Sequence, residues 1–455
     1  MSSFNRLICT SSGRYYVYEG LTGKILTIHP SLYGDSFEKT EKQIRAFLYP
    51  KYLTAQERFD EVAWEYEFPQ YLERINNRIP VLLLQTTCRC NLDCRYCVYS
   101  GNYSHVEPHA DHDMSEEIML QSIDFFAVKN EQAPDAVISF YGGEALLRFE
   151  VLQKAVKYAR QRIQGKPLRF QISTNGMLLN GMVAQWLLEN PDIQVMVTVN
   201  GPFQDRYRVT ASGGGSLKLI MENLKVLREQ YPGVWKDQIY FVANISQVSE
   251  LEDLLLFYRE QIRKAPYVIT AIRSLDGNEV IREITEGSKE ERERGLQKER
   301  RLSEEYCKTQ DPYLYAWFRE GMASVQNRLV SDDCGVGRIR SCLPGLGKLY
   351  VFSDGTFGLC ESSCDRLRFG DVRHGFDKKA LWQLYEGGKQ LYRKKCCGCW
   401  AQRLCRICLA LVINPDGTLM EEIPEETCMR MRSQALQDLE RYCEIRSCDS
   451  RELPE

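Results

Sequence analysis

Apolar runs and amphipathic stretches alternate between residues 79 and 273. The short apolar runs predict six β-strands, at residues 81–85, 136–141, 168–173, 193–199, 238–245 and 267–272. The longer stretches between them have apolar positions at helical spacing and predict helices at 115–129, 148–164, 181–190, 217–231 and 251–263. This alternation favours an α/β fold with a parallel sheet and crossover helices. Six strand–helix units are too few for a complete eight-stranded barrel.

The first 78 residues follow a different pattern, which predicts a small module of their own. Two β-rich runs, at 14–19 and 24–28, flank a short loop that begins at Gly20 and ends at Gly23. This arrangement predicts a hairpin. Helical patterns follow at about 36–47 and 54–66. The alternative is an appendage that packs on the rest of the chain and binds nothing.

Charge and hydropathy exclude some classes of partner. The chain has 455 residues and a formal net charge of -3, which predicts two or three domains and no general attraction to nucleic acid or anionic membranes. The sequence has no apolar run of membrane-spanning length. Its first residues lack the basic region and apolar core of a signal peptide. We therefore expect a cytoplasmic protein that binds neither nucleic acid nor membrane.

Cysteine is the unusual residue of this composition, with 18 in the chain. Disulfide frameworks are typical of short secreted proteins, whereas this long chain groups its cysteines, which favours metal ligation. Cys90, Cys94 and Cys97 form the pattern C-x3-C-x2-C, unlike the C-x2-C pairs of zinc ribbons. Because a [4Fe–4S] cluster is usually held by four thiolates, three imply a distant fourth ligand or an iron open to a small molecule. A structural metal knuckle or a few buried thiols is the alternative.

Glycine-containing turns follow three of the predicted strands. Gly142-Gly143-Glu144 follows the second strand, the turn at Asn175 follows the third, and the turn at Asn200 follows the fourth. The carboxyl ends of parallel barrel strands meet at one rim, where the chemistry of such barrels collects. We therefore expect these turns to lie near the cysteine triad, which follows the first strand. Taken singly, each could be an ordinary turn.

The cysteine pattern, completed by Tyr96 as C-x3-C-x-aromatic-C, resembles the signature of the radical S-adenosylmethionine (SAM) superfamily. The resemblance implies that Cys90, Cys94 and Cys97 hold a [4Fe–4S] cluster whose open iron is chelated by the amino and carboxylate groups of SAM. It also implies an open, partial (βα)6 barrel with a wide mouth for a large substrate. One electron on the cluster would cleave SAM to methionine and a 5′-deoxyadenosyl radical, which removes a hydrogen atom from an unactivated carbon.

The same resemblance extends to the turns at the strand ends. Gly142, Gly143 and Glu144 are similar to the family's GGEP motif, with Ala145 in place of proline. The glycines would let backbone carbonyls approach the SAM ammonium group, and Glu144 would add a carboxylate. The other expected SAM contacts are Ser173, Asn175 and Arg208. A guanidinium at the last of these positions suits the SAM carboxylate.

Cysteines return after residue 333 with a spacing that resembles the SPASM domain, an auxiliary-cluster extension of radical SAM peptide modifiers. The core pattern from Cys396 to Cys408 is C-x2-C-x5-C-x2-C, where the family commonly has x3 in the last interval. The resemblance implies one auxiliary [4Fe–4S] cluster on Cys334, Cys342, Cys360 and Cys408 and a second on Cys396, Cys399, Cys405 and Cys428. A pair of zinc sites is the competing interpretation, since four thiolates also suit zinc. We interpret Cys364 and Cys397 as spare thiols that could substitute as ligands, and Cys9, Cys307, Cys443 and Cys448 as ordinary thiols.

These patterns predict five segments along the chain. They are a peptide-recognition module at 1–78, a radical SAM partial barrel at 79–275, a helical bridge at 276–333, the SPASM domain at 334–430, and a C-terminal helix and tail at 431–455. The first segment resembles the winged-helix-like element with which peptide-maturing enzymes bind a leader peptide as an added strand.

This combination resembles maturases of Cys-rich ribosomally synthesised peptides (RiPP maturases) of the ranthipeptide or sactipeptide type. We therefore expect an oxidoreductase that installs thioether bonds, from Cys sulfur to carbon, in a precursor peptide with a leader sequence. An electron donor such as flavodoxin or ferredoxin would be its second partner. Alternative modifications are a carbon–carbon cross-link, epimerisation, or formylglycine formation in an anaerobic sulfatase. The non-enzyme alternative is a zinc-rich scaffold or nucleic-acid binder.

Overall fold

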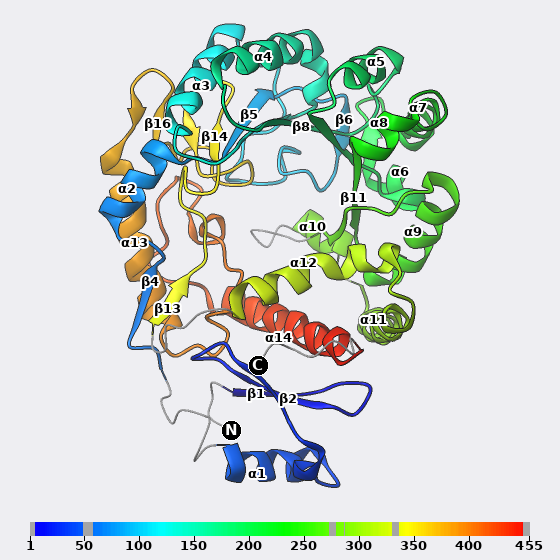
Figure 1. Cartoon of the computed structure of the whole chain (residues 1–455), viewed down its shortest axis with the longest axis vertical. Coiled ribbons are helices and arrows are strands. Elements are labelled where there is room, and N and C mark those ends of the chain that lie inside the picture. Colours follow the sequence, from blue (N-terminus) through cyan, green and yellow to red (C-terminus); the bar gives the residue numbers. More distant parts are fainter. Residues whose placement is uncertain (1–4, 49–57, 273–278, 286, 330–335, 449–455) are drawn as a thin grey trace.

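The structure, a computed structural model, describes residues 5–48, 58–272, 279–285, 287–329 and 336–448 (Figure 1). Its centre is an eight-stranded sheet in the order β12-β11-β9-β8-β7-β5-β14-β15. Six of these strands run parallel to their neighbours: β5 (Val81–Thr87), β7 (Ala136–Gly142), β8 (Leu168–Thr174), β9 (Ile193–Thr198), β11 (Ile239–Ile245) and β12 (Val268–Ala271). The six predicted strands are therefore confirmed, and so is the α/β fold class.

Helices cover the outer side of this curved sheet (Figure 1). They are α3 (Glu116–Lys129), α4 (Phe149–Arg162), α5 (Gly181–Glu189), α6 (Gln204–Tyr207), α7 (Leu217–Gln230), α8 (Pro232–Asp237) and α9 (Leu251–Phe257). The five predicted helices are present, although the last continues beyond Phe257 as a π-helical segment, Tyr258–Ile262. On β8, Phe170 and Ile172 are buried, whereas Gln171 and Ser173 are half-buried. Because strand side chains alternate, Gln171 and Ser173 lie on the other face, toward the barrel interior.

The Cys-rich region contributes a hairpin to the same sheet. Strand β14 (Leu349–Val351) pairs in parallel with β5, and β15 (Phe357–Gly358) pairs antiparallel with β14. This hairpin extends the barrel sheet beyond its first strand. This pairing brings the segment before Cys360 alongside the strand that leads to the cysteine triad.

The N-terminal region begins with a three-stranded sheet in the order β1-β2-β3. Its strands are β1 (Asn5–Cys9), β2 (Tyr15–Glu19) and β3 (Ile25–Thr27), and the helix α1 (Phe37–Leu48) follows. The predicted hairpin and first helix are confirmed, and β1 is an additional strand. On one face, Val17 packs with Ile28 and Ile44 in a small separate core. On the other face, Tyr16 and Tyr18 belong to the main hydrophobic core of the molecule.

The predicted helix at 54–66 is wrong where the structure describes it, and residues 54–57 lie outside the described residues. Glu61–Trp64 forms strand β4, which pairs in parallel with β13 (Val336–Ile339). Trp64 is buried, and its indole Nε1 donates to the carbonyl of Tyr385 at 2.8 Å. A partner strand more than 270 residues away overrides the local helical pattern. Helix α2 (Phe68–Asn77) follows.

The remaining elements lie at the cysteine triad, in the helical segment after the barrel and in the Cys-rich region. The helices are α10 (Glu279–Thr285), α11 (Lys289–Thr309), α12 (Pro312–Leu329), α13 (Lys378–Cys396) and α14 (Glu425–Cys448). The short strands are β6 (Leu92–Cys94), β10 (Arg208–Thr210), β16 (Gly370–Asp371) and β17 (Gly375–Phe376). Cys307 and Cys448, expected to be ordinary thiols, instead form a disulfide between α11 and α14 because those helix ends meet. Within the described ranges, no helix has the length and hydrophobicity that a membrane span requires.

Candidate functional site

Cys90, Cys94 and Cys97 come together directly after β5. The short strand β6 carries Cys94, and the backbone N–H of Cys97 donates to the carbonyl of Cys94 at 3.0 Å, which closes a tight turn. Burial raises the pKa of Cys90 to about 11 and that of Cys97 to about 12, and the neighbouring thiols act in the same direction. Three thiolates in this position therefore require a positive partner, which a bound metal cluster supplies.

The Gly142-Gly143 turn lies against the backbone of the cysteine loop. The N–H of Gly143 donates to the carbonyl of Thr87, and the N–H of Glu144 donates to the carbonyl of Arg89, both at 2.8 Å. A Cβ on Gly142 would overlap the Thr87 oxygen, and one on Gly143 would overlap the Arg89 oxygen. Gly142 also has a φ of +136°, which side chains rarely adopt. The two glycines thus allow the second strand end to approach the cysteine loop.

Glu144 joins the ends of β7 and β8. Its Oε1 accepts hydrogen bonds from the Thr174 hydroxyl at 2.8 Å and the Leu146 N–H at 3.0 Å, and its Oε2 accepts from the Asn175 N–H at 2.8 Å. The side chain is buried, and burial raises its pKa although these hydrogen bonds oppose the shift. Because both oxygens accept hydrogen bonds from the chain itself, Glu144 holds the ends of β7 and β8 together, and its contact with SAM stays a prediction.

Asn175 is held at the cysteine loop by its side chain. Its Nδ2 donates to Asn91 Oδ1 at 2.7 Å and lies 3.9 Å from the sulfur of Cys90, while its Oδ1 accepts from the Met177 N–H at 3.0 Å. Ser173 is two residues earlier, on the inner face of β8. The structure therefore brings both predicted SAM contacts to the same rim as the cysteine triad.

Arg208 lies opposite Cys94 where β10 pairs antiparallel with β6. Its side chain is buried, Nη1 donates to the Tyr96 hydroxyl at 3.3 Å, and Nε has no hydrogen-bond partner among the described residues. Burial acts to lower the Arg208 pKa, but Tyr96 and Cys94 act in the opposite direction, and the pKa lies above its ordinary value. Arg206, the neighbouring candidate, instead pairs with Glu250 at 2.9 Å.

A buried cation with an unsatisfied N–H indicates a missing anionic ligand. Leaving such a charge without a partner costs on the order of several kcal/mol. A carboxylate that accepts from the guanidinium would offset that cost with a charge-assisted hydrogen bond. The residues of this rim therefore fit a cluster on the three thiols together with a small ligand that carries a carboxylate next to it.

The first predicted auxiliary set is also assembled in part. Cys342, Cys360 and Cys408 are neighbours, whereas Cys334 lies outside the described residues. Burial raises the pKa of Cys360 to about 12, and Glu361 and Cys408 add to this effect. The Ser341 hydroxyl accepts a hydrogen bond from the N–H of Leu409 at 2.7 Å. This bond connects the segment that carries Cys342 to the segment that carries Cys408.

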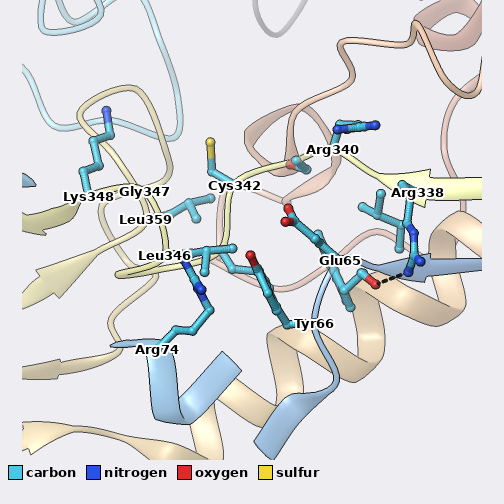
Figure 2. A pocket seen from close by; sticks show the side chains of 14 residues that line it. Glu65, Tyr66, Arg74, Arg338, Arg340, Cys342, Leu346, Gly347, Lys348 and Leu359 are labelled. Carbon is cyan, nitrogen blue, oxygen red and sulfur yellow. Dashed lines mark hydrogen bonds between the residues drawn. The ribbon is translucent and has the colours of Figure 1, made fainter. Parts of the chain in front are cut away.

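A cavity of about 730 Å³ opens beside Cys342. Figure 2 shows Arg74, Tyr66 and Lys348 around it, with the Cys342 sulfur at its edge. The Lys348 ammonium pairs with Glu361 at 2.5 Å. This face of the first auxiliary set is therefore open to solvent and bordered by positive side chains.

The second predicted auxiliary set consists of Cys396, Cys399, Cys405 and Cys428. These thiols lie close enough to one another to raise one another's pKa. The backbone N–H of Cys399 donates to the carbonyl of Cys396 at 3.1 Å at the end of α13. Burial raises the pKa of Cys405 to about 11. Of the two spare cysteines, Cys364 is buried, and its thiol donates to the carbonyl of Pro415 at 3.5 Å.

The spacing of these cysteines bears on the choice of metal. Among the described residues, no three His, Cys, Asp or Glu side chains converge closely enough to hold one metal ion. A [4Fe–4S] cluster places each thiolate on a different iron, so its ligands stand farther apart than the four thiolates around one zinc ion. The four thiols of the second set therefore match the number of ligands that such a cluster takes.

Three tyrosines that the sequence analysis did not single out lie between the triad and the first auxiliary set. The hydroxyls of Tyr99 and Tyr350 are 3.3 Å apart, and Tyr99 also donates to the carbonyl of Glu361 at 3.1 Å. Tyr141 packs on the same cluster of side chains. Burial raises the pKa of all three tyrosines well above the ordinary value. The position of Tyr99, two residues after Cys97, could have marked it as a neighbour of the triad. Its contact with Tyr350 could not be predicted, because Tyr350 lies 251 residues later in the chain.

The comparisons with known proteins agree with this geometry. Residues 84–256 match the radical SAM superfamily. A serine-type anaerobic sulfatase-maturating enzyme from Bacteroides thetaiotaomicron is 28% identical over 195 residues, which are 41% of this chain and 46% of that protein. A radical SAM cyclopropyl synthase from Paramaledivibacter caminithermalis is 25% identical over 160 residues, which are 33% of each protein. The chain thus matches less than half the length of these curated relatives.

A solved structure, described as native anSMEcpe with bound AdoMet and Kp18Cys peptide, has a similar fold. It superposes with a TM-score of 0.55 at 18% identity, over 79% of this chain and 97% of that chain. The matched residues 84–256 include the end of β5, the cysteine triad, the turns at Gly143 and Asn175, and Arg208. This segment of the chain is therefore a radical SAM domain.

Proposed function

We propose that this protein is a radical SAM enzyme that modifies a peptide, and that the modification is a thioether bond from a Cys sulfur to a carbon. The observation that carries the proposal is the buried Arg208 guanidinium opposite Cys94, whose Nε has no partner among the described residues. SAM brings a carboxylate, which this guanidinium can bind while the amino and carboxylate groups reach the open iron of a cluster.

In this proposal, some residues at the carboxyl ends of the barrel strands hold the cluster and SAM, and others keep those residues in position. When bound, the cluster and SAM supply the one-electron chemistry that removes a hydrogen atom from an unactivated carbon. Cys90, Cys94 and Cys97 hold the cluster, and Arg208 fixes the carboxylate end of SAM. Asn175 offers its amide to the same ligand, while Glu144 keeps that strand end in register through its three hydrogen bonds.

The auxiliary cysteine sets support an oxidative modification. Forming a thioether removes two hydrogens from the peptide, one as a hydrogen atom and the other as a proton plus an electron. The electron needs an acceptor near the barrel. The Tyr99–Tyr350 contact joins the triad to the set that contains Cys360, and clusters on the two sets would provide that acceptor. An electron carrier such as flavodoxin or ferredoxin would then restore the starting redox state.

A peptide substrate is supported by the N-terminal sheet. Its order β1-β2-β3 leaves β1 and β3 as edge strands among the described residues. An extended leader peptide can add to such an edge through backbone hydrogen bonds. Residues 1–78 would thus hold the leader while the rest of the peptide enters the barrel.

The experiment that tests the thioether proposal is mass spectrometry of Cys-containing precursor peptides after incubation with the reduced, reconstituted protein and SAM. We expect the loss of two hydrogens per modification and a Cys that no longer reacts with iodoacetamide. The Cys97→Ala variant is the control and should leave the peptide unchanged. A carbon–carbon cross-link would lose the same mass but keep its thiols reactive, and epimerisation would keep the mass and take up deuterium from D2O.

Formylglycine formation is the second candidate, because relatives described as sulfatase-maturating enzymes match the radical SAM domain. Its product would react with a hydrazide, which a thioether does not. Removal of residues 1–78 discriminates further, since a leader-dependent maturase should lose activity on its precursor. Modification of a sulfatase-derived peptide but of no leader-bearing precursor would contradict the thioether proposal.

A further inference from the structure

One face of the N-terminal sheet is attached to the second auxiliary cysteine set. Arg6 and Tyr18 stand opposite each other in the antiparallel pairing of β1 and β2, so that their side chains lie on one face. The Arg6 guanidinium lies 4.1 Å from the centroid of the Trp400 ring, and the Tyr18 ring meets Trp400 edge-on at 6.3 Å. Trp400 immediately follows Cys399. The sheet is therefore packed directly on the segment that carries this set.

A buried arginine also joins the N-terminal sheet to the segment that carries the second auxiliary cysteine set. Arg403, which is 1% exposed, donates from Nε to the carbonyl of Leu21 at 2.6 Å. Leu21 belongs to the loop that follows β2, and Arg403 lies between Cys399 and Cys405. The position of β2 relative to the cysteine set is thus fixed at two points, by stacking on Trp400 and by this hydrogen bond.

The hydroxyl of Tyr18 is the group that this packing leaves unexplained. Tyr18 is 0% exposed, and its hydroxyl has no hydrogen-bond partner among the described residues. Burial raises the pKa of Tyr18; the Arg403 guanidinium opposes this effect, and the nearby Cys399 thiol adds to it. Burying a hydroxyl without a hydrogen-bond partner destabilises a folded protein. A phenylalanine would fill the same space without that cost, so the hydroxyl indicates an acceptor that binds beside Cys399.

We infer that the Tyr18 hydroxyl donates a hydrogen bond to a sulfur of a cluster held by Cys396, Cys399, Cys405 and Cys428. The inference rests on the proposed function, which places an auxiliary cluster on these thiols. In this inference the N-terminal sheet β1-β2-β3 contacts that cluster, and Tyr18 is a positioning residue. Hydrogen bonds to cluster sulfurs stabilise the reduced form because they offset the added negative charge. Tyr18 would therefore raise the reduction potential of this cluster.

The test is a redox titration of the reconstituted full-length protein, followed by electron paramagnetic resonance. In Tyr18→Phe we expect one of three clusters to shift to a more negative midpoint potential, with the other two and the iron content unchanged. Tyr16→Phe is the matched control, since Tyr16 is also buried on the same face of β2 but neighbours Arg14 and Cys443. It should leave all three potentials unchanged. A chelator should also remove iron several-fold faster from Tyr18→Phe than from the control.

The possible results separate this inference from the proposed function. If three clusters are present and Tyr18→Phe has the same potentials as the control, the inference alone is overturned. If the second auxiliary set binds no cluster, both the inference and the proposed cofactor set are overturned. The cluster-free protein gives an independent check, because removal of a hydroxyl without a partner should not lower its melting temperature. A Tyr18→Phe chain that unfolds without clusters would contradict the inference.

Discussion

Arg208 and Cys94 lie directly opposite each other in the pairing of β10 with β6. This register places a buried guanidinium beside the cysteine triad, although the two residues are more than a hundred positions apart in the chain. The cation and the thiols belong to one site because a three-residue ladder holds them there. The proposed binding of SAM depends on this relationship more than on any single motif.

Replacing Arg208 with glutamine should weaken SAM binding while the cluster on the triad remains. The charge-assisted hydrogen bond to the SAM carboxylate contributes about 1.5–3 kcal/mol, which corresponds to a loss of about 10- to 150-fold in affinity. Equilibrium binding of SAM to the reconstituted protein measures this loss. Arg206→Gln is the control, because Arg206 pairs with Glu250 and should change SAM affinity by less than about threefold. Equal losses in both variants would remove Arg208 from the site.

From the contact between Tyr99 and Tyr350 we predict that replacing Tyr99 with phenylalanine destabilises the protein more than replacing Tyr350. Tyr99→Phe removes the donor to Glu361 and leaves the fully buried Tyr350 hydroxyl without its partner, so it should cost about 1–3 kcal/mol in free energy of unfolding. Tyr350→Phe should cost less, because Tyr99 keeps its hydrogen bond to Glu361. Urea denaturation of the two variants and of the double variant measures these differences. A larger cost for Tyr350→Phe would show that the hydrogen bonds are arranged differently.

The sequence predicts an element of this structure when the residues that determine the element are close together in the chain. The six strands and their helices were predictable because each apolar run is complete within a few residues. The strand β4 was not, since its partner β13 is distant. The hydrogen bonds of Glu144 were not predictable either, since its partners Thr174 and Asn175 come from the end of the next strand along the chain. Contacts that depend on tertiary pairing leave no local pattern.

The cysteine motifs illustrate the same limit. The resemblance of their spacing to the family motifs suggested the ligand sets, and the structure places the thiols of the triad and of the second auxiliary set near one another. It could not predict the approach of Tyr18 to Cys399, because the N-terminal sheet reaches that set only through the packing of Trp400 and Arg403. Spacing predicts ligands more readily than it predicts their surroundings.

Asp113 should make stability depend on pH in the acidic range. It accepts hydrogen bonds from Thr87 at 2.6 Å, from Arg89 at 2.6 and 3.0 Å, and from Arg148 at 2.6 Å. Burial acts to raise its pKa, but these partners outweigh burial, and the folded-state pKa lies below the ordinary value. Because an unfolded Asp has a pKa of about 3.9, the unfolded chain binds more protons just below about pH 5. The stabilisation is therefore complete above that pH and is lost as the pH falls through the folded-state pKa.

Asp113→Asn tests this expectation. The variant should be less stable by about 1 kcal/mol or more at neutral pH, and its free energy of unfolding should fall less steeply between about pH 5 and pH 3. Denaturation curves of the full-length chain at several pH values measure both effects. Asp111→Asn is the control, because Asp111 is 95% exposed and lies 3.7 Å from Arg89. A parallel pH dependence in wild type and Asp113→Asn would contradict the assignment.

The central claim is that the cysteine triad and Arg208 bind a cluster and SAM, and SAM cleavage tests it most directly. Reconstituted protein, reduced without oxygen and supplied with SAM, should release methionine and 5′-deoxyadenosine in equal amounts. Cys94→Ala should abolish this release and lose about four of about twelve irons, the content of one [4Fe–4S] cluster in three. If the fully loaded wild-type protein released no 5′-deoxyadenosine, or if Cys94→Ala released as much as wild type, the account would be contradicted.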